Sequence, residues 1–508
     1  MVFFRLATRT GGYMRRARAN PITGAAGGGF SRGAFLCGAA GIALAGWGLT
    51  GHSDADPVSN SSGPAVAKPN WTKLERRIRG RVVRVGDVDY GSAKQVFNTR
   101  FDNETPAAVV QVANTDDVVA ALAFAAKYHL PVAARAGGHS YAGVSTATDA
   151  LIIDVRQLTG VNVNAGQAII GPGHTLYEVY RELDRSGLAI PTGMCPDVGI
   201  TGLTLGGGLG FESRSYGLTC DRLTGATLVL PDGTVAEVSA TSRPDLFWAL
   251  RGGGSLFGVV TSLTFDTIPA TPKDLVQLTF PGEKAARVIA GWSTWLRSAD
   301  RGQWADVSID ADGDGNVDCW MQMVCPAGTG PRAAASLTDA IGVHPLTLDT
   351  QTLEHMDAIT QLAGGAPTMP RASFTNGSDV VTDLTPDAID RIIEAITTFS
   401  RAGGTGWVQI NTLDGAIRDT GPTATAFPWR FHAALVEWGA YQPIPHDTAL
   451  NWVTAAHKLF APVSAGAYAN YLEPGDALAR YYGQNYPRLA KLRRTIDPGN
   501  RIHTVLTA

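Results

Sequence analysis

The sequence of 508 residues is poor in cysteine and in charge. Five cysteines without a C-x-x-C pair exclude a disulfide-stabilised scaffold and indicate no zinc site. Charged residues make up 17% of the chain, the net charge is −3, and no basic stripe follows the N-terminal arm, so we expect neither nucleic acid nor a metal as a partner. The cysteines are Cys37, Cys195, Cys220, Cys319 and Cys325, and we expect no disulfide between the last two.

The N-terminal apolar run is shorter than the about 20 residues that a membrane-spanning helix needs. It extends from Ala34 to Leu49 and follows a basic arm, which is typical of an export signal. The stretch SRGAFL resembles a twin-arginine signal, except that Gly33 replaces the second arginine. An uncleaved anchor and a mis-assigned start stay open. We expect a bacterial protein exported to the periplasm, envelope or medium, touching the membrane only transiently, with its folded part beginning near Trp71.

Glycine, in contrast, is abundant, with 59 residues that often occur in clusters. Clustered glycines indicate backbone that approaches a ligand closely. The segment RAGGHSYAGVS, residues 135–145, is the first cluster. Its backbone N–H groups and Arg135 could hold a pyrophosphate, which needs converging donors without Cβ atoms in the way. His139 and Ser140 follow directly.

Local patterns predict a mixed α and β chain. Thr115 begins a helix as its cap, Pro131 forbids its continuation, and a strand over Val132–Arg135 follows, so residues 135–145 form a loop after a strand. In the second half, alternating stretches predict one antiparallel sheet. Further predicted elements are a strand over Ala150–Val155, helices over Thr175–Asp184, 242–250 and 385–401, a hairpin at Asp232-Gly233, paired strands around 310–318, long strands over 406–416 and 430–441, and a C-terminal helix before Pro498-Gly499.

Three stretches of the sequence resemble known motifs but do not match them. GHSYA lacks the glycine that a hydrolase nucleophile turn requires, because Ala142 stands there. The runs at 206–211 and 252–258 do not fit a dinucleotide fingerprint, since Phe211 and Phe257 occupy glycine positions. The run DADGDGNVD resembles a calcium loop, but its twelfth position is Met321 and not glutamate, so we expect a hairpin turn.

Four segments in order resemble the FAD-linked oxidases of the vanillyl-alcohol oxidase superfamily, in particular the berberine-bridge-enzyme-like branch. They are residues 135–145, the glycine-rich stretch 191–223, the stretch 245–263 and the C-terminal YYGQNYPRL. The resemblance implies an α+β fold with a two-part FAD-binding domain and a substrate domain whose antiparallel sheet is flanked by helices. We expect a signal-like segment and linker over 1–70, FAD-binding parts over 71–268 and 461–508, and the substrate domain over 269–460.

The same resemblance implies FAD attached through two bonds. His139 stands where the family links its histidine to the 8α-methyl of the flavin, and Cys195 stands where many members link a cysteine to ring carbon 6. A thiolate is the competent nucleophile, so backbone dipoles would help Cys195. The predicted cofactor-binding residues are Arg135, Gly137, Gly138, His139, Ser140, Gly193, Cys195, Val198, Gly199, Gly202, Gly207, Gly208, Gly210, Val260, Tyr482 and Asn485.

A flavin oxidation of this kind removes a hydride from a substrate carbon while a base takes the hydroxyl proton. The resemblance places Tyr468 and Tyr471 at the ring, and Glu437 or His432 could act as the base. Val198 and Gly193 match the pattern of members that react with molecular oxygen.

We therefore expect an oxidase that acts on an alcohol carbon of a sugar, an oligosaccharide or an aromatic compound and releases hydrogen peroxide. A dehydrogenase with another acceptor, an intracellular biosynthetic oxidase and a flavin-loaded binding protein with little turnover stay open. The sequence identifies neither the substrate nor the oligomeric state.

Overall fold

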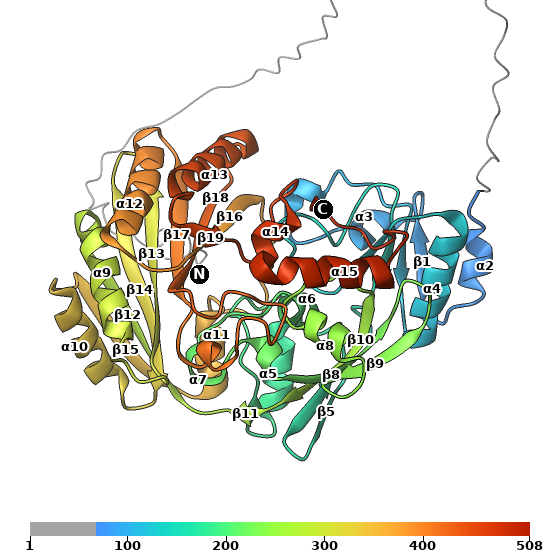
Figure 1. Cartoon of the computed structure of the whole chain (residues 1–508), viewed down its shortest axis with the longest axis horizontal. Coiled ribbons are helices and arrows are strands. Elements are labelled where there is room, and N and C mark those ends of the chain that lie inside the picture. The colour runs from blue at the N-terminus through green and yellow to red at the C-terminus, as the bar shows by residue number, and fades with distance from the viewer. Residues whose placement is uncertain (1–67, 508) are drawn as a thin grey trace, which may run out of the picture. The chain divides into compact units, whose positions relative to one another are not determined.

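The computed structural model describes residues 68–507. The predicted export signal and Cys37 lie outside these residues. The described part has an α+β fold, which confirms the predicted class. An eight-stranded sheet with its helices lies on one side in Figure 1, and two smaller sheets lie on the other. In the described part of the chain, no helix is both long enough and apolar enough to span a membrane.

The first small sheet has four strands and carries the loop with His139. Its order is β1-β2-β4-β3, with β2, β4 and β3 parallel and β1 antiparallel. A helix, α4 (Thr115–Tyr128), packs its buried side chains into the same core. Its cap is Asn114 and not the predicted Thr115, because the Asn114 side chain accepts the N–H of Asp117 at 2.9 Å. The strands are β1 (Arg81–Arg84), β2 (Ala108–Gln111), β3 (Val132–Arg135) and β4 (Leu151–Asp154).

The second small sheet has five antiparallel strands in the order β5-β6-β10-β8-β9. Its helix α5 (Leu176–Asp184) begins with a capping box between Thr175 and Glu178, which satisfies two backbone donors. The predicted turn at Asp232-Gly233 joins β8 to β9, as expected. The elements here are β5 (Val161–Asn164), β6 (Gln167–Ile170), β8 (Leu223–Val229), β9 (Val235–Ser239), β10 (Val259–Asp266), α6 (Ile200–Leu205), α8 (Pro244–Leu250) and the paired short strands β7 (Leu188–Ala189) and β11 (Ile268–Pro269).

The large sheet has eight antiparallel strands, ordered β15-β12-β14-β13-β17-β18-β16-β19. Four helices bury an apolar core against one of its faces, around Trp292 and Trp438. The predicted antiparallel sheet is therefore confirmed. Its elements are β12 (Lys273–Phe280), α9 (Ala285–Leu296), β13 (Trp304–Asp312), β14 (Val317–Pro326), α10 (Gly330–Ile341), β15 (Thr347–Leu353), α11 (His355–Leu362), β16 (Phe374–Val381), α12 (Pro386–Arg401), β17 (Thr405–Thr412), β18 (Ala434–Tyr441), α13 (His446–Phe460) and β19 (Ser464–Gly466).

The calcium-like run is a hairpin turn between β13 and β14, as predicted. The Asp312 carboxylate accepts the N–H groups of Asp314 and Asn316 at 2.8 and 3.0 Å, and these bonds hold its pKa at about 2 despite some burial. Cys319 and Cys325 lie on β14, and neither forms a disulfide.

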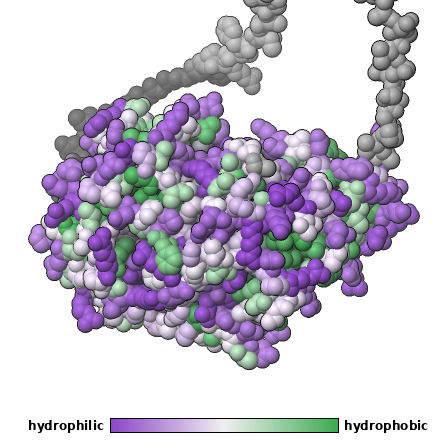
Figure 2. Space-filling model, in the orientation of Figure 1, coloured by the Kyte–Doolittle hydropathy of each residue, from purple (hydrophilic) through white to green (hydrophobic). Residues whose placement is uncertain are grey.

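The C-terminal segment contacts both halves of the structure. β19 extends the large sheet beside β16, whereas α15 (Tyr486–Ile496) packs near α8 and Ile502 bridges to Val132 of β3. Figure 1 shows α14 (Leu478–Tyr482) and α15 in red in front of the smaller sheets. The surface in Figure 2 is largely hydrophilic, with scattered apolar side chains.

A half-buried network around His457 fastens the C-terminal segment to α13 and β16. Its two ring nitrogens lie 2.6 Å from Asp379 and 2.9 Å from Glu473, and Arg480 bonds Glu473 at 2.7 Å. Burial alone would lower the pKa of His457, but its bonds to the two carboxylates outweigh burial and raise the pKa to about 9. Protonated His457 therefore links three elements.

This network makes stability depend on pH in a defined direction. Because the folded pKa of His457 is raised above its ordinary value near 6.5, its contribution is complete below about pH 6.5 and is lost as the pH rises through about 9. We expect His457→Gln to lower the free energy of unfolding by about 3 kcal/mol at pH 6 and by much less at pH 9.5. Denaturant titrations of both proteins at the two pH values measure this, and a difference independent of pH would contradict it.

Candidate active site

Two glycine loops from the smaller sheets meet backbone to backbone. A Cβ atom on Gly137 would lie 2.3 Å from the backbone nitrogen of Gly199, and one on Gly199 would lie 2.4 Å from that of Gly137. Any side chain at either position would force the loops apart. The contact brings the loop that carries His139 beside the loop that carries Cys195, as the predicted double attachment requires.

The imidazole of His139 is half-buried and stacks on Phe97, with ring centroids 4.0 Å apart. The Phe97 N–H donates to the carbonyl of Gly138 at 3.0 Å, which ties the backbone of the two segments together. Burial lowers the pKa of His139 to about 3. The ring is therefore neutral at ordinary pH, and a nitrogen lone pair is available to form a bond.

The thiol of Cys195 is half-buried at the centre of a titratable cluster. Burial raises its pKa, and the negative charges of Glu437 and Asp197 add to that effect. The sequence suggested help from backbone dipoles, but desolvation dominates. Cys195 also interacts electrostatically with Tyr141, which shows that the cluster extends across the site.

Glu437 of β18 is the buried carboxylate of the cluster, with 5% of its surface exposed. Asn376 of β16 donates to its Oε1 at 2.9 Å, and the hydroxyls of Tyr471 and Tyr141 also donate to it. The two tyrosine rings stack at 4.9 Å with an interplanar angle of 8°. Burial raises the pKa of Glu437, while the three donors stabilise its charged form. A carboxylate held in this way can accept a proton from a bound hydroxyl.

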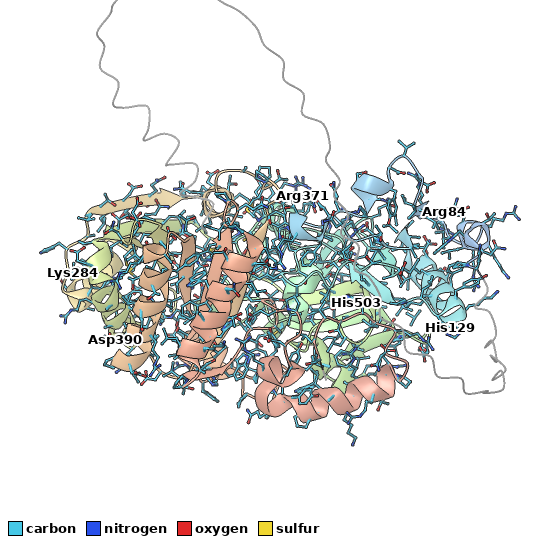
Figure 3. The ribbon with its side chains drawn as sticks, turned by 90° about the horizontal axis from the view of Figure 1, so that it is seen from above. Arg84, His129, Lys284, Arg371, Asp390 and His503 are labelled. Carbon is cyan, nitrogen blue, oxygen red and sulfur yellow. The ribbon has the colours of Figure 1, made fainter. Side chains whose placement is uncertain are left out.

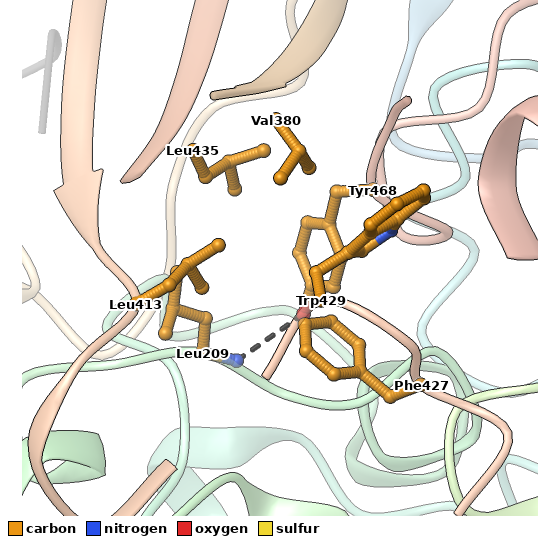
Figure 4. A pocket seen from close by; sticks show the side chains of 7 residues that line it. All are labelled: Leu209, Val380, Leu413, Phe427, Trp429, Leu435 and Tyr468. Carbon is orange, nitrogen blue, oxygen red and sulfur yellow. Dashed lines mark hydrogen bonds between the residues drawn. The ribbon is translucent and has the colours of Figure 1, made fainter. Parts of the chain in front are cut away.

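Tyr468 lies against Tyr471, but its hydroxyl has different partners. It accepts the N–H groups of Gly208 and Leu209 at 3.0 and 3.2 Å and the amide of Asn470 at 2.8 Å. Figure 4 shows the bond from Leu209 beside an apolar pocket. Burial raises the pKa of Tyr468 to about 12. Its hydroxyl thus braces the glycine loop, whereas that of Tyr471 faces the carboxylate. The pocket is lined by Leu209, Val380, Leu413, Phe427, Trp429, Leu435 and Tyr468.

Several predicted cofactor residues have their side-chain polar groups engaged by the protein. The guanidinium of Arg135 is buried against Asp154 at 2.8 Å and bonds the carbonyl of Ala93 at 2.5 Å, so its cation supports the loop scaffold. The Asn485 amide donates to the carbonyl of Pro422 at 2.7 Å. The Ser140 hydroxyl accepts the N–H of Val144.

The remaining predicted cofactor residues lie in the same loops and the adjoining core. A Cβ on Gly202 would meet nothing within 4 Å, so this part of α6 leaves open space. Gly138, Gly207 and Gly208 have φ of 72°, 123° and 87°, a region that disfavours other residues. Gly193 and Gly210 approach their neighbours closely, and Val198, Val260 and Tyr482 pack in the core of the five-stranded sheet. His432 packs edge-on against Trp429, 5.2 Å away.

The site fits the implied FAD. Among the described residues, no hydrogen bond engages the His139 imidazole or the Cys195 thiol, although both lie in glycine loops with closely approaching backbone. Bare backbone in left-handed conformations provides N–H donors for a pyrophosphate without obstructing Cβ atoms. The neutral imidazole and the thiol are the side chains that would hold the ring.

The face of the large sheet that carries Glu437 is polar and aromatic. Glu437 pairs across the strands with Gln409, Gln409 with Ser308, and Ser308 with Trp320. Trp320 donates to Asp310 at 3.0 Å, and Gln409 donates to Asp306 at 2.7 Å. Burial raises the pKa of Asp306 to about 7. Aromatic surface with spaced polar groups is typical of a ligand-binding wall.

Sequence reasoning missed the partners that complete the cluster. Tyr141 lies two residues after His139, so the first glycine motif itself carries the signal that could have identified it. Asn376 and Tyr441 reach the site only because β16 pairs with β18, and no local motif marks them. Tyr441 stacks on Trp407, with ring centroids 4.4 Å apart. Burial raises the pKa of Tyr441, and the negative charge of Glu437 adds to this effect.

The close contact of the glycine loops is open to a direct test. Gly137→Ala inserts a methyl group against the backbone of Gly199, and we expect it to lower the free energy of unfolding by about 1–3 kcal/mol. The control is Gly91→Ala in α3 (Tyr90–Ala93), where a Cβ would meet nothing within 4 Å. Denaturant unfolding measures both, and a Gly137→Ala protein as stable as the control would contradict the contact.

Two family models match the chain. The FAD binding domain model covers residues 106–239, and the model described as berberine and berberine like covers residues 467–502. The first contains both His139 and Cys195, and the second contains Tyr468 and Tyr471.

Similar proteins extend over most of the chain. The xylooligosaccharide oxidase of Thermothelomyces thermophilus is 27% identical over 87% of this chain and 94% of its own length. The carbohydrate oxidase of Microdochium nivale is 29% identical over 82% of this chain and 90% of its own length. The solved structure of the xylooligosaccharide oxidase from Myceliophthora thermophila in complex with xylobiose superposes with a TM-score of 0.77 at 25% identity, over 86% of this chain and 99% of that one.

These matches confirm the predicted enzyme class and its FAD-binding fold, while they test neither the site residues nor the origin and export. The chain is therefore similar to FAD-linked oxidoreductases over most of its length, and it carries an FAD binding domain match and a berberine-like match.

Proposed function

We propose that the chain is an oligosaccharide oxidase in which FAD is attached through His139 and Cys195 and molecular oxygen accepts the electrons. The observation that carries the proposal is the convergence of Cys195, Glu437 and Tyr471 beside the polar face of the large sheet. The relatives named as oxidases of carbohydrates support the substrate class.

Glu437 is the proposed base. When bound, FAD supplies a two-electron acceptor for the hydride of the substrate carbon. The chain's part is to receive the proton of the substrate hydroxyl at the Glu437 carboxylate. Tyr471, Tyr141 and Asn376 orient that carboxylate, and their bonds favour its charged form against the effect of burial. The raised pKa brings its basicity closer to what a proton acceptor needs near neutral pH.

The sheet face favours a sugar chain over a single small alcohol. From Glu437, the polar positions continue over β17 and β13 to Trp320 on β14. Strands lie about 4.8 Å apart, so four strands span roughly 14 Å, longer than one sugar ring. A sugar oriented with its oxidised carbon at Glu437 would extend toward Trp320.

The oxygen and export parts of the proposal rest on the sequence. Val198 and Gly193, beside Cys195, match the pattern of oxygen-reacting members. The signal-like segment supports export to the periplasm, envelope or medium. The mature N-terminus of protein made in the native host tests export separately.

The substrate class and the base are tested together. We expect neutral oligosaccharides to bleach the flavin absorbance without oxygen, with colour and peroxide returning in air. Glu437→Gln should slow the bleaching by about 10²–10⁴-fold, because the proton acceptor is lost. Stopped-flow absorbance measures the rate, and Glu394→Gln on the exposed face of α12 is the control.

Each other result has a meaning. Bleaching that persists in air would indicate a dehydrogenase with another acceptor, and a flavin that stays yellow with every sugar and aromatic alcohol would indicate a binding protein. Wild-type rates in Glu437→Gln would exclude Glu437 as the base.

The two attachments are tested by acid denaturation and filtration. Wild-type protein should keep its yellow colour above the filter, His139→Ala and Cys195→Ala should each keep it through the remaining bond, and the double variant should release it. Peptide masses identify the linked residue. Colour in the wild-type filtrate would refute covalent attachment and leave the FAD fold unaffected.

A further inference from the structure

Residues Met369–Asn376, here termed the strap, run from the region after α11 into β16. Two glycines precede them, Gly364 and Gly365, with φ of 88° and 85°, and a Cβ on either would meet nothing within 4 Å. The strap therefore follows a turn with free space beside its glycines and ends inside the large sheet. Between these points it contacts both glycine loops.

On the His139 side, the strap holds the segment that carries Phe97. The Arg371 Nε donates to the carbonyl of Val96 at 2.7 Å, and the N–H of Thr99 donates to the carbonyl of Ala372 at 3.0 Å. The buried amide of Asn98 donates to the carbonyl of Phe374 at 3.0 Å. Phe97, on which His139 stacks, lies between these bonded residues.

On the Cys195 side, the strap reaches the loop two residues after the thiol. The N–H of Met369 donates to the carboxylate of Asp197. The Asp197 carbonyl would lie 2.9 Å from a Cβ on Gly137, so the same loop is packed against the His139 loop. The strap thus joins both attachment loops from one side.

At its end, the strap reaches the proposed base. Asn376 donates to Glu437, and Phe374 packs edge-on against Tyr141 with ring centroids 5.1 Å apart. Eight consecutive residues therefore contact the support of His139, the loop of Cys195 and the carboxylate. In Figure 3, Arg371 lies between the large sheet with its helices and the smaller sheets.

We propose that the strap is the positioning element that fixes the relative positions of the His139, Cys195 and Glu437 side chains, and that Arg371 anchors the strap. Arg371 fits this role because its fork also pairs with Asp102, so one side chain fastens the strap to two points of the segment 96–102. The effect on flavin attachment rests on the proposed function, whereas the contacts of the strap do not depend on it.

The consequence concerns how completely the flavin becomes attached. Each attachment forms one bond to a ring-system carbon and removes one hydrogen from the side chain and one from that carbon. The two hydrogens and their electrons pass to dioxygen as hydrogen peroxide, the acceptor already proposed. Both bonds form only if the two side chains sit at the right separation, which the strap sets.

The test is the fraction of purified protein that carries both bonds, read from peptide masses after expression with FAD. We expect Arg371→Ala to lower the doubly attached fraction at least threefold. Arg371→Lys should have an intermediate effect, because it keeps the charge near Asp102 but loses the forked geometry. The matched control is Arg301→Ala, which removes an equally forked pair with Asp419 remote from the strap.

Amide hydrogen exchange gives a second reading that does not depend on covalent attachment. Exchange of the Phe97 and Met369 N–H groups, which donate to Gly138 and Asp197, should accelerate at least tenfold in Arg371→Ala and Arg371→Lys and stay unchanged in Arg301→Ala. If Arg371→Ala does not fold, Arg371→Lys and Asp102→Asn provide both readings.

The outcomes separate the strap from the proposed function. A wild-type protein without covalent flavin would refute the attachment, and exchange would then decide on the strap alone. Wild-type attachment and wild-type exchange in the folded Arg371 variants would overturn the strap proposal.

Discussion

The site depends on one close approach, the backbone contact between Gly137 and Gly199. It joins a loop that leaves a parallel strand to a loop that precedes α6, and these loops carry the two side chains suited to hold FAD. No side-chain interaction could replace it, because the distance leaves no room for a Cβ on either side. The cost is the conformational entropy of two glycines, and the gain is that the loop of the imidazole and the loop of the thiol are fixed beside each other.

Burial then determines the chemistry of the groups that this contact assembles. It keeps His139 neutral, the thiol of Cys195 protonated and the pKa of Glu437 raised. Because burial disfavours the charged form of all three side chains, they differ mainly in the hydrogen bonds that they receive. Glu437 has three hydrogen-bond donors, which favour its charged form, whereas His139 and Cys195 have no such partner among the described residues and would be available to a cofactor.

Local signals in the sequence predict the elements and the glycine loops well, because turns, caps and alternation are properties of neighbouring residues. The strand before His139 and the hairpin at Asp232-Gly233 show this. The errors and omissions have other causes. Asn114 replaces Thr115 as the helix cap because the helix begins one residue earlier than the pattern suggested. The bond from Arg135 to Asp154 joins neighbouring parallel strands, and no local pattern indicates it. Asn376 enters the site through the pairing of distant strands, since it lies 61 residues from Glu437 in the chain, and no local motif encodes that pairing.

The polar face of the large sheet has two parts that differ in how a substitution there would affect the site. β16 continues from the strap and β18 carries Glu437, so under both proposals a substitution on their polar face would affect the attachment loops as well as the substrate. β13 and β14 lie farther along the sheet, and Trp320 and Ser308 have no bond to the strap or to either glycine loop among the described contacts. Under the proposed function, a change on β13 or β14 would therefore alter the fit of the distal part of the substrate without disturbing the attachment loops. Under the proposed function, one oxidation chemistry could therefore serve sugar chains of different kinds, because the strands that would contact the distal part of the substrate lie apart from the attachment loops.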